Sequence, residues 1–269
     1  MTNKPIAIIL AAGEGRRLRP LTVHKPKCLV KLFGKSILEY QIECFKNCGI
    51  NNIIVVTGYL GDSIRFPNII YLKNKKFHKT NMMYSLFCAE PFFKNSSSII
   101  VSYGDIIFEE RILKKLLSVK EDFSVVIDKN WKKYWNLRFV EPLSDAESLK
   151  INKNGYITDI GKKVKNIEEI NGQYIGLMKF QGKSINKIRK KYDALKKASL
   201  NGENIMNPNT TFEKSFMTDF LMYLINSGEK IKAVSIKNGW LELDSINDYK
   251  LYNKMYKNGN ISRFFRAEK

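Results

Sequence analysis

The sequence predicts an α/β fold in which helices flank a mostly parallel, mixed sheet and a small strand-rich lobe follows it. Two observations lead to this prediction. In the first half, apolar runs rich in β-branched residues alternate with helical patterns, which is typical of parallel strands covered on both faces. From about Trp131 the pattern changes to short strands separated by turns.

The first half alternates strands and helices along the chain. Each predicted strand is a continuous apolar run bounded by turn residues, and each predicted helix repeats apolar residues every three or four positions. The predicted strands are Ile6–Ala12, Asn52–Thr57, Ile69–Leu72, Ser98–Tyr103 and Phe123–Ile127, and the predicted helices are Ile37–Asn47, Asn81–Ala89 and Glu110–Ser118. Parallel sheets bind ligands at the carboxyl ends of their strands, so residues 13–27 are expected at a ligand site.

The second half begins with a predicted hairpin. Lys153-Asn154-Gly155 supplies the turn between the strands Leu149–Ile151 and Tyr156–Ile160. After it we expect a strand at Tyr174–Phe180, a basic helix at Ser184–Lys197, a loop at Asn201–Thr211, a helix at Phe216–Ile225, strands at Lys232–Ile236 and Trp240–Leu243, and a helix at Ile246–Tyr256. The sequence predicts one domain over residues 1–252, with the strand-rich lobe at about 128–215, and a basic tail over 253–269.

A formal net charge of +20 is compatible with a nucleic-acid-binding module. The lysines are spread evenly, however, and the densest cluster, from Lys73 to Lys79, is short and interrupted by Phe77 and His78. A nucleic-acid groove concentrates its cations in a stripe with interleaved aromatic residues. We therefore expect no nucleic acid partner and keep nucleic-acid binding as a remote alternative.

Compartment and assembly follow from what the sequence lacks. It has no apolar run near the ~20 residues of a membrane span and no signal segment at its N-terminus. Its four cysteines, Cys28, Cys44, Cys48 and Cys88, show no spacing typical of a metal knuckle. We expect a cytoplasmic protein with free thiols and no membrane insertion. The oligomeric state is left open, a homodimer included.

The segment from residue 7 to residue 30, AIILAAGEGRRLRPLTVHKPKCLV, joins a buried strand to a loop of glycines and cations. Gly13 and Gly15 allow backbone N–H groups to approach a ligand closely and to form an anion-binding nest. Arg16, Arg17 and Lys27 add positive charge that suits a polyphosphate. The spacing fits neither the phosphate-loop lysine motif nor the dinucleotide fingerprint, which needs a third glycine.

The order of residues in this segment resembles the signature of the nucleotidyltransferases that activate sugar phosphates and phosphocholine. The matching residues are Leu10-Ala11-Ala12-Gly13-x-Gly15-x-Arg17-Leu18, Pro20-Leu21-Thr22 and Pro26-Lys27-x-Leu29-Val30. The resemblance implies a Rossmann-like nucleotidyltransferase fold, a nucleoside triphosphate substrate, and Arg17 and Lys27 as catalytic residues that hold the phosphates. It implies nucleotide contacts from Leu10, Ala11, Ala12, Gly13, Glu14, Gly15, Arg17, Lys27, Gly58, Asn81, Ser85 and Gly104. Arg16 stands where the family usually has a small hydroxyl residue.

Displacement at a triphosphate needs Mg²⁺ to neutralise charge, and Mg²⁺ needs hard oxygen ligands. Asp105 follows an apolar run and therefore lies at the carboxyl end of a strand. Glu242 and Asp244 are two apart on a short strand, so both point to one face. The resembled family carries metal-binding aspartates in these two contexts, which map to Asp105 and Asp244. We expect a magnesium site at Asp105, Asp244 and Glu242.

The acceptor substrate is expected to bind in the strand-rich lobe. Tryptophan faces and carboxylates suit a cationic amine group, and basic side chains suit its phosphate or phosphonate. An alternative is that Trp131 and Trp135, four apart, form an apolar helical face in the core. The predicted acceptor-binding residues are Asp128, Trp131, Trp135, Arg138, Glu147, Lys162, Tyr174 and Trp240.

Several segments are similar to the cytidylyltransferase branch of the family, and the likeness extends from about Ile6 to Tyr249. The branch implies Mg²⁺-dependent transfer of CMP from CTP to a phosphocholine, phosphoethanolamine, aminoethylphosphonate or phosphoglutamine type of metabolite, with release of pyrophosphate, in cell-surface polysaccharide biosynthesis. The alternative is a sugar-1-phosphate nucleotidyltransferase that uses UTP or dTTP. The similar segments are Thr80-Asn81-Met82, Asp128-x-x-Trp131, Gly161-Lys162-Lys163, Gln173-Tyr174-x-Gly176 and Trp240-x-Glu242-x-Asp244.

Overall fold

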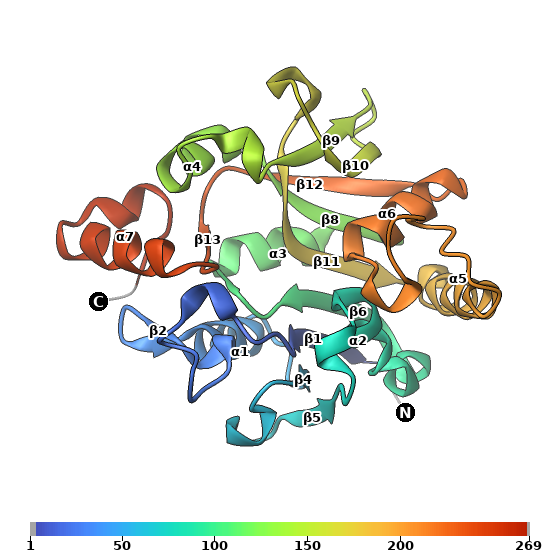
Figure 1. The fold of residues 1–269 in the computed structure, drawn as a ribbon, viewed down its shortest axis with the longest axis horizontal. Helices are drawn as coiled ribbons and strands as arrows, with labels where there is room; N and C mark the ends of the chain where they lie inside the picture. Colours follow the sequence, from blue (N-terminus) through green and yellow to red (C-terminus); the bar gives the residue numbers. More distant parts are fainter. Residues whose placement is uncertain (1–3, 268–269) are drawn as a thin grey trace.

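A computed structural model of the chain describes residues 4–267, and seven strands of this range form its central sheet (Figure 1). Among the seven, β11 runs antiparallel to both of its neighbours, and the other six strands run parallel to one another. The mostly parallel, mixed sheet predicted from the sequence is therefore confirmed. In spatial order the strands are β12 (Ile231–Ile236), β8 (Phe123–Asp128), β11 (Gln173–Gln181), β6 (Ser96–Tyr103), β1 (Lys4–Ala11), β4 (Asn52–Thr57) and β5 (Ile70–Lys73).

Helices cover both faces of the sheet, and each face has its own apolar core. One core contains side chains of α1 (Ile37–Asn47), α3 (Glu110–Ser118), α4 (Trp131–Arg138) and α7 (Ile246–Lys257). The opposite core contains side chains of α2 (Met82–Phe87), α5 (Lys183–Ser199) and α6 (Met217–Asn226). Because the central strands are buried on both faces, their sequences are continuous apolar runs rather than alternating patterns.

Three two-stranded sheets complete the described part of the chain. The hairpin of β9 (Glu147–Ile151) and β10 (Ile157–Lys163) forms the strand-rich lobe, at the top of Figure 1. The strand β7 (Ile106–Phe108) pairs with β13 (Trp240–Glu242), and this pairing connects the end of β6 to the segment before α7. β2 (Lys31–Leu32) pairs with β3 (Lys35–Ser36).

The helices begin where the sequence supplies caps. The Ser36 side chain accepts a hydrogen bond from the backbone N–H of Glu39, whose carboxylate accepts from the Ser36 N–H. Ser245 and Asp248 form the same reciprocal pair at the start of α7. Each such box satisfies two of the backbone donors that a helix start leaves unpaired. Every predicted helix and strand is present, with ends that differ by at most three residues.

The strands β2, β3 and β7 were not predicted, since runs of two or three residues carry no clear periodicity, and α4 was considered only as the alternative in which Trp131 and Trp135 form an apolar helical face. The end of the chain also differs from the prediction of a basic tail. α7 continues to Lys257, and Ile261 and Phe265 after it are buried in the core. The backbone N–H of Gly239 donates to the carbonyl of Phe264 at 2.6 Å. The end of the described chain is thus anchored to the domain by Ile261 and Phe265. No helix within residues 4–267 combines the length and the apolar character that crossing a membrane requires.

Candidate active site

Two adjoining cavities open at the carboxyl ends of β1 and β6, where the sequence predicted a ligand site. The first has a volume of about 330 Å³ and the second of about 290 Å³. Four residues line both cavities: Arg17, Met82, Tyr103 and Asp244. A ligand in one cavity therefore lies directly beside a ligand in the other.

The loop after β1 forms one wall of the first cavity, and its conformation depends on Gly15. This residue has a φ of 64°, which favours glycine, and its carbonyl accepts a hydrogen bond from the Thr22 hydroxyl at 2.8 Å. A Cβ atom on Gly15 would lie 2.9 Å from the Cβ of Lys27. A Cβ atom on Gly13 would have no neighbour within 4 Å. Gly15 is thus needed to pack the loop against Lys27, whereas Gly13 leaves its side of the loop open to the cavity.

Lys27 joins the two predicted metal carboxylates. Its Nζ atom lies 2.8 Å from Oδ2 of Asp105 and 2.8 Å from Oδ1 of Asp244. Burial alone would lower the pKa of Lys27, but the two carboxylates more than offset it and raise the pKa above its usual range. Lys27 is therefore a cation at neutral pH.

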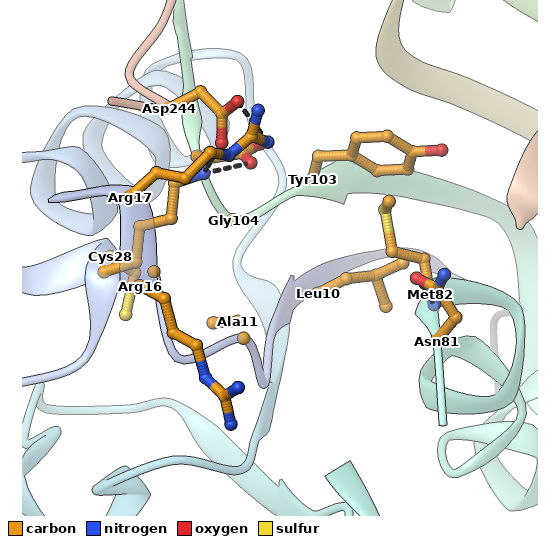
Figure 2. A pocket seen from close by; sticks show the side chains of 14 residues that line it. Leu10, Ala11, Arg16, Arg17, Cys28, Asn81, Met82, Tyr103, Gly104 and Asp244 are labelled. Atoms are coloured by element: carbon orange, nitrogen blue, oxygen red, sulfur yellow. Dashed lines mark hydrogen bonds and ion pairs between the residues drawn. The ribbon is translucent and has the colours of Figure 1, made fainter. Parts of the chain in front are cut away.

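Arg17 makes a second ion pair with Asp244, and most of its side chain stays exposed to solvent. Figure 2 shows Arg17 extending toward Asp244 and Arg16 pointing away from it, while Asn81 and Met82 form the opposite wall. The Arg16 guanidinium instead pairs with Glu14, with its Nε 2.5 Å from Oε2. The two arginines of the loop thus have different environments, and Arg17 is the one beside the carboxylates.

One oxygen of Asp105 is a candidate metal ligand. Its Oδ1 atom is buried and has no hydrogen-bond partner among the described residues, whereas Oδ2 accepts from Lys27. A buried polar atom without a partner is costly, so a cation at this point would stabilise it. Within residues 4–267 no group of three His, Cys, Asp or Glu side chains is placed to hold a metal ion. Two carboxylates fit Mg²⁺ if substrate phosphates and water complete its ligands.

Two further glycines, which directly follow β4 and β6, allow the backbone there to pack closely against the end of β1. A Cβ atom on Gly104 would lie 2.5 Å from the carbonyl oxygen of Leu10, and one on Gly58 would lie 2.5 Å from that of Ala12. Gly104 lines the first cavity, whereas Gly58 does not. Gly58 is therefore needed for close backbone packing next to the site and does not form part of the cavity wall.

Most of the predicted nucleotide contacts line the first cavity. Asn81 does so while it caps α2, where its Oδ1 accepts from the Met82 N–H at 2.8 Å. Ser85 is buried behind this wall and accepts a hydrogen bond from Asn74 at 3.0 Å. Four predicted residues lie outside the lining: Ala12, Glu14, Gly58 and Ser85. The lining itself consists of Leu10, Ala11, Gly13, Gly15, Arg16, Arg17, Lys27, Cys28, Asn81, Met82, Tyr103, Gly104, Asp105 and Asp244. Cys28, Met82 and Tyr103 were not predicted, although each is next to a predicted residue.

The second cavity is rich in carboxylates and aromatic rings. Asp145 accepts a hydrogen bond from the Trp135 indole N–H at 3.2 Å. The Glu147 carboxylate has no hydrogen bond or ion pair with any described residue. Glu147 stays accessible to solvent, but partial desolvation by its neighbours and the negative charges of Asp145 and Asp219 together raise the pKa of Glu147 to about 7. Of the predicted acceptor residues, Trp135, Glu147, Tyr174 and Trp240 line this cavity.

Four predicted acceptor residues lie elsewhere, and the structure gives them other roles. Asp128 is fully buried and accepts hydrogen bonds from the Trp240 indole at 2.9 Å and from the backbone N–H of Asn130 and Asn238. Trp131 is buried in the core on α4, as the alternative interpretation of this segment proposed. Lys162 is largely exposed and pairs with Asp159 at 2.5 Å.

Arg138 is the fourth of these residues. Its side chain is 1% exposed and pairs with Glu242 and Asp248. Glu242, a predicted metal ligand, lines the second cavity and has its Oε2 atom 2.6 Å from Nη1 of Arg138. Asp105 and Asp244 are therefore the predicted metal residues that share Lys27, while Glu242 belongs to the Arg138 network.

Comparisons with known proteins identify the family and the fold of the chain. The profile of the MobA-like NTP transferase domain matches residues 7–150. A CTP:phosphoglutamine cytidylyltransferase from Campylobacter jejuni is 41% identical over 251 residues, which are 90% of this chain and 96% of that protein. A choline-phosphate cytidylyltransferase from Streptococcus pneumoniae is 44% identical over 94 residues, 34% of this chain and 41% of that protein. The structure of an inositol-1-phosphate CTP transferase from T. maritima superposes with a TM-score of 0.69 at 23% identity, over 99% of each chain, and shows the same fold.

Proposed function

This chain belongs to the nucleotidyltransferases with a MobA-like NTP transferase domain, and we propose that it transfers CMP from CTP to a small phosphorylated metabolite that carries a cationic amine. Phosphoglutamine is the first acceptor to test. The relative that is 41% identical over 90% of this chain bears the name CTP:phosphoglutamine cytidylyltransferase. The single observation that carries the proposal is the cluster of Lys27, Asp105 and Asp244 at the junction of the two cavities.

In this proposal CTP occupies the first cavity. Its triphosphate approaches the loop at Gly13 and Gly15, whose small size leaves the backbone accessible, and Arg17 and Lys27 provide the positive charge. An oxygen of the acceptor phosphate attacks the α-phosphorus of CTP, and a new P–O bond forms. The bond between the α-phosphorus and the oxygen that leads to the β-phosphate breaks, and pyrophosphate leaves.

The reaction needs no general base, because the acceptor phosphate is already an anion at neutral pH. Catalysis then depends on positioning two anions and on stabilising the charge that develops between them. Asp105 and Asp244 would hold a divalent metal, Mg²⁺ in the first instance, which neutralises triphosphate charge when bound. Lys27 and Arg17 pair with these carboxylates here and are placed to turn toward the phosphates.

The acceptor would occupy the second cavity. Glu147 and Asp145 place negative charge on its wall, and the Glu147 carboxylate has no cationic partner among the described residues. An ammonium or a quaternary amine matches this environment, whereas a neutral sugar leaves the carboxylates unpaired. This comparison supports an amine-bearing acceptor over a sugar phosphate.

The test is pyrophosphate release, measured with CTP, UTP, ATP, GTP and dTTP against a panel of acceptors. The panel contains phosphoglutamine, phosphocholine, phosphoethanolamine, 2-aminoethylphosphonate, inositol 1-phosphate and glucose 1-phosphate. We expect the highest kcat/KM with CTP and an amine-bearing acceptor, and loss of turnover in the Asp105→Asn variant, which controls for contaminating enzymes. Turnover of UTP or dTTP with glucose 1-phosphate and none with CTP would instead identify a sugar-1-phosphate nucleotidyltransferase.

A further inference from the structure

A buried ion-pair network lies directly behind Asp244, and Arg138 is at its centre. Arg138 is the last residue of α4, and its guanidinium lies over the rings of Tyr134, Trp135 and Phe139 at 4.9 to 5.7 Å from their centroids. Its Nη1 atom donates to Glu242 at 2.6 Å, and Nε and Nη2 donate to Asp248 at 3.0 and 3.2 Å. One planar guanidinium thus connects two carboxylates that stand on either side of Asp244 in the sequence.

The network reaches the backbone of Asp244 itself. The Oδ2 atom of Asp248 accepts hydrogen bonds from the backbone N–H of Asp244 at 3.1 Å and of Ser245 at 2.9 Å. Because Arg138 holds Asp248, it fixes the point at which the chain leaves β13 and enters α7. The position of the Asp244 carboxylate follows from this backbone.

The backbone of Glu242, which precedes Asp244 in the chain, is also held by hydrogen bonds with side chains. The backbone N–H of Glu242 donates to the Tyr134 hydroxyl at 2.9 Å, and the Tyr252 hydroxyl donates to the carbonyl of Glu242 at 2.9 Å. Tyr134 belongs to α4, as Arg138 does, and Tyr252 belongs to α7. The short strand β13 is therefore clamped by side chains rather than by a long ladder of its own.

Stability alone is a weak reason for such a network. Replacing a buried group of charges by apolar residues of similar size often leaves a protein equally or more stable. What the network provides is a fixed geometry, since the guanidinium fork and both carboxylates have defined directions. The network reaches Asp244, whose carboxylate forms ion pairs with Lys27 and Arg17 in the site.

We propose that Arg138 is a positioning residue for the transfer reaction, which holds Glu242 and Asp248 and thereby keeps the Asp244 carboxylate in register with Asp105 and Lys27. The inference rests on the proposed function only in what it says of catalysis. Arg138 does not contact the acceptor, because its side chain is 1% exposed and does not line the second cavity. It acts through Asp248 and the backbone.

The test compares Arg138→Lys with the matched control Arg189→Lys. Lysine keeps the charge at position 138 but lacks the planar fork that bridges two carboxylates. Arg189 pairs with Glu90, is partly buried, and lies on α5, on the opposite face of the sheet. We expect Arg138→Lys to lower kcat by about tenfold to a hundredfold, the range for a small displacement of a reacting group, while both KM values, measured at saturating Mg²⁺, stay unchanged. Arg189→Lys should match the wild type.

Two measurements report on the geometry without turnover. Amide hydrogen exchange of residues 244 and 245 should be faster in Arg138→Lys, because the N–H groups of Asp244 and Ser245 lose the fixed carboxylate of Asp248 as their acceptor. Mn²⁺ binding, followed by electron paramagnetic resonance with CTP present and no acceptor, should weaken. If the wild type does not transfer CMP, the proposed function fails, and the exchange data still show whether Arg138 holds this segment.

The variant Asp248→Asn breaks the same bridge from its other side and keeps the side chain's size, so it serves if Arg138→Lys does not fold by circular dichroism. Unchanged kcat and unchanged exchange in a folded variant would overturn the proposal. A raised acceptor KM with unchanged kcat would also overturn it, since that result assigns Arg138 to the acceptor site.

Discussion

Lys27 and Asp244 form an ion pair of 2.8 Å, and the same ammonium group lies 2.8 Å from Asp105. One lysine thus bridges the two carboxylates that are the best candidates for metal binding. In the described chain Lys27 and Arg17 balance the negative charge of Asp105 and Asp244, so a metal ion bound by these carboxylates would displace the two cations. A metal ion would take over the carboxylates, and the two cations would face the triphosphate.

The first prediction concerns removal of this bridge. Lys27→Met should lower kcat by ~100-fold or more, which is typical for loss of one preorganised electrostatic group. It should also lower Tm, since removal of the ammonium group leaves the partly buried Asp105 without a cationic partner and Asp244 with Arg17 alone. Added Mg²⁺ should restore more of the Tm in the variant than in the wild type, because the ion replaces the missing charge.

Differential scanning fluorimetry with and without Mg²⁺ measures the effect on stability, and initial rates measure the effect on kcat. The control is Lys73→Met, which removes an exposed ion pair with Asp62. Near-normal turnover of Lys27→Met would show that Lys27 serves the fold and not the reaction.

The second prediction separates the two glycines of the loop. Gly15→Ala should lower both Tm and kcat, because its φ of 64° disfavours alanine and the new Cβ would press on Lys27 at 2.9 Å. Gly13→Ala should keep the Tm of the wild type, since no atom lies within 4 Å of its added Cβ. The methyl group would narrow the first cavity, so the KM for CTP should rise. Equal behaviour of the two variants would contradict the assignment of this cavity to CTP.

The sequence predicts the sheet well because the buried parallel strands are continuous apolar runs, whereas the amphipathic helices between them repeat apolar residues every three or four positions. It also predicts that residues 13–27 and Asp105 lie at the carboxyl ends of strands, where ligands bind in such sheets. The family resemblance added Asp105 and Asp244 as metal residues, whereas the ion pairs of Lys27 with both carboxylates were not predicted. Periodicity and local motifs are therefore sufficient to predict the part of the site that lies at the carboxyl ends of the strands.

The acceptor side is less predictable, because the same residue types suit a pocket and a core. Trp131 and Trp135 lie on one short helix, yet only Trp135 lines the second cavity. Arg138 was predicted to bind the acceptor, but it pairs with Glu242 and Asp248, which stand 104 and 110 positions later. Such long-range partners are visible only in the folded chain.

The third prediction is a pH dependence of acceptor binding. The pKa of Glu147 is raised to about 7 by partial loss of water around this solvent-accessible residue and by the charges of Asp145 and Asp219. Below this pKa the carboxyl group is protonated and offers no charge to a cationic acceptor. The acceptor KM should therefore fall by about tenfold between pH 6 and pH 8, as the ionised fraction rises.

The control for this profile is Glu147→Gln. The phosphate of the acceptor also titrates, with a second pKa of about 6, and contributes its own pH dependence. That contribution persists in the variant, whereas the part due to Glu147 disappears.

The stability of the fold depends on pH in the opposite direction to acceptor binding. The folded state holds the proton of Glu147 more tightly than the unfolded chain, so ionisation between pH 4.5 and pH 7 destabilises the fold, and the variant should lose this decline. A wild-type KM that changes no more than the variant's would remove Glu147 from the acceptor site.

The last prediction distinguishes the two tryptophans of α4, which pack edge to face with ring centroids 6.1 Å apart. Both are buried, and truncation of a large buried aromatic side chain costs about 3–5 kcal/mol of stability. Trp131→Ala should therefore lower the free energy of unfolding in denaturant, while the enzyme that remains folded keeps its acceptor KM. Trp135→Ala should lose a similar amount and also raise the acceptor KM, because Trp135 lines the second cavity and its indole N–H holds Asp145. The KM for CTP should stay the same in both variants, since neither ring lines the first cavity. An acceptor KM that rises equally in both would mean that α4 shifts as a unit, and an acceptor KM that rises in neither would place the amine of the acceptor away from Trp135.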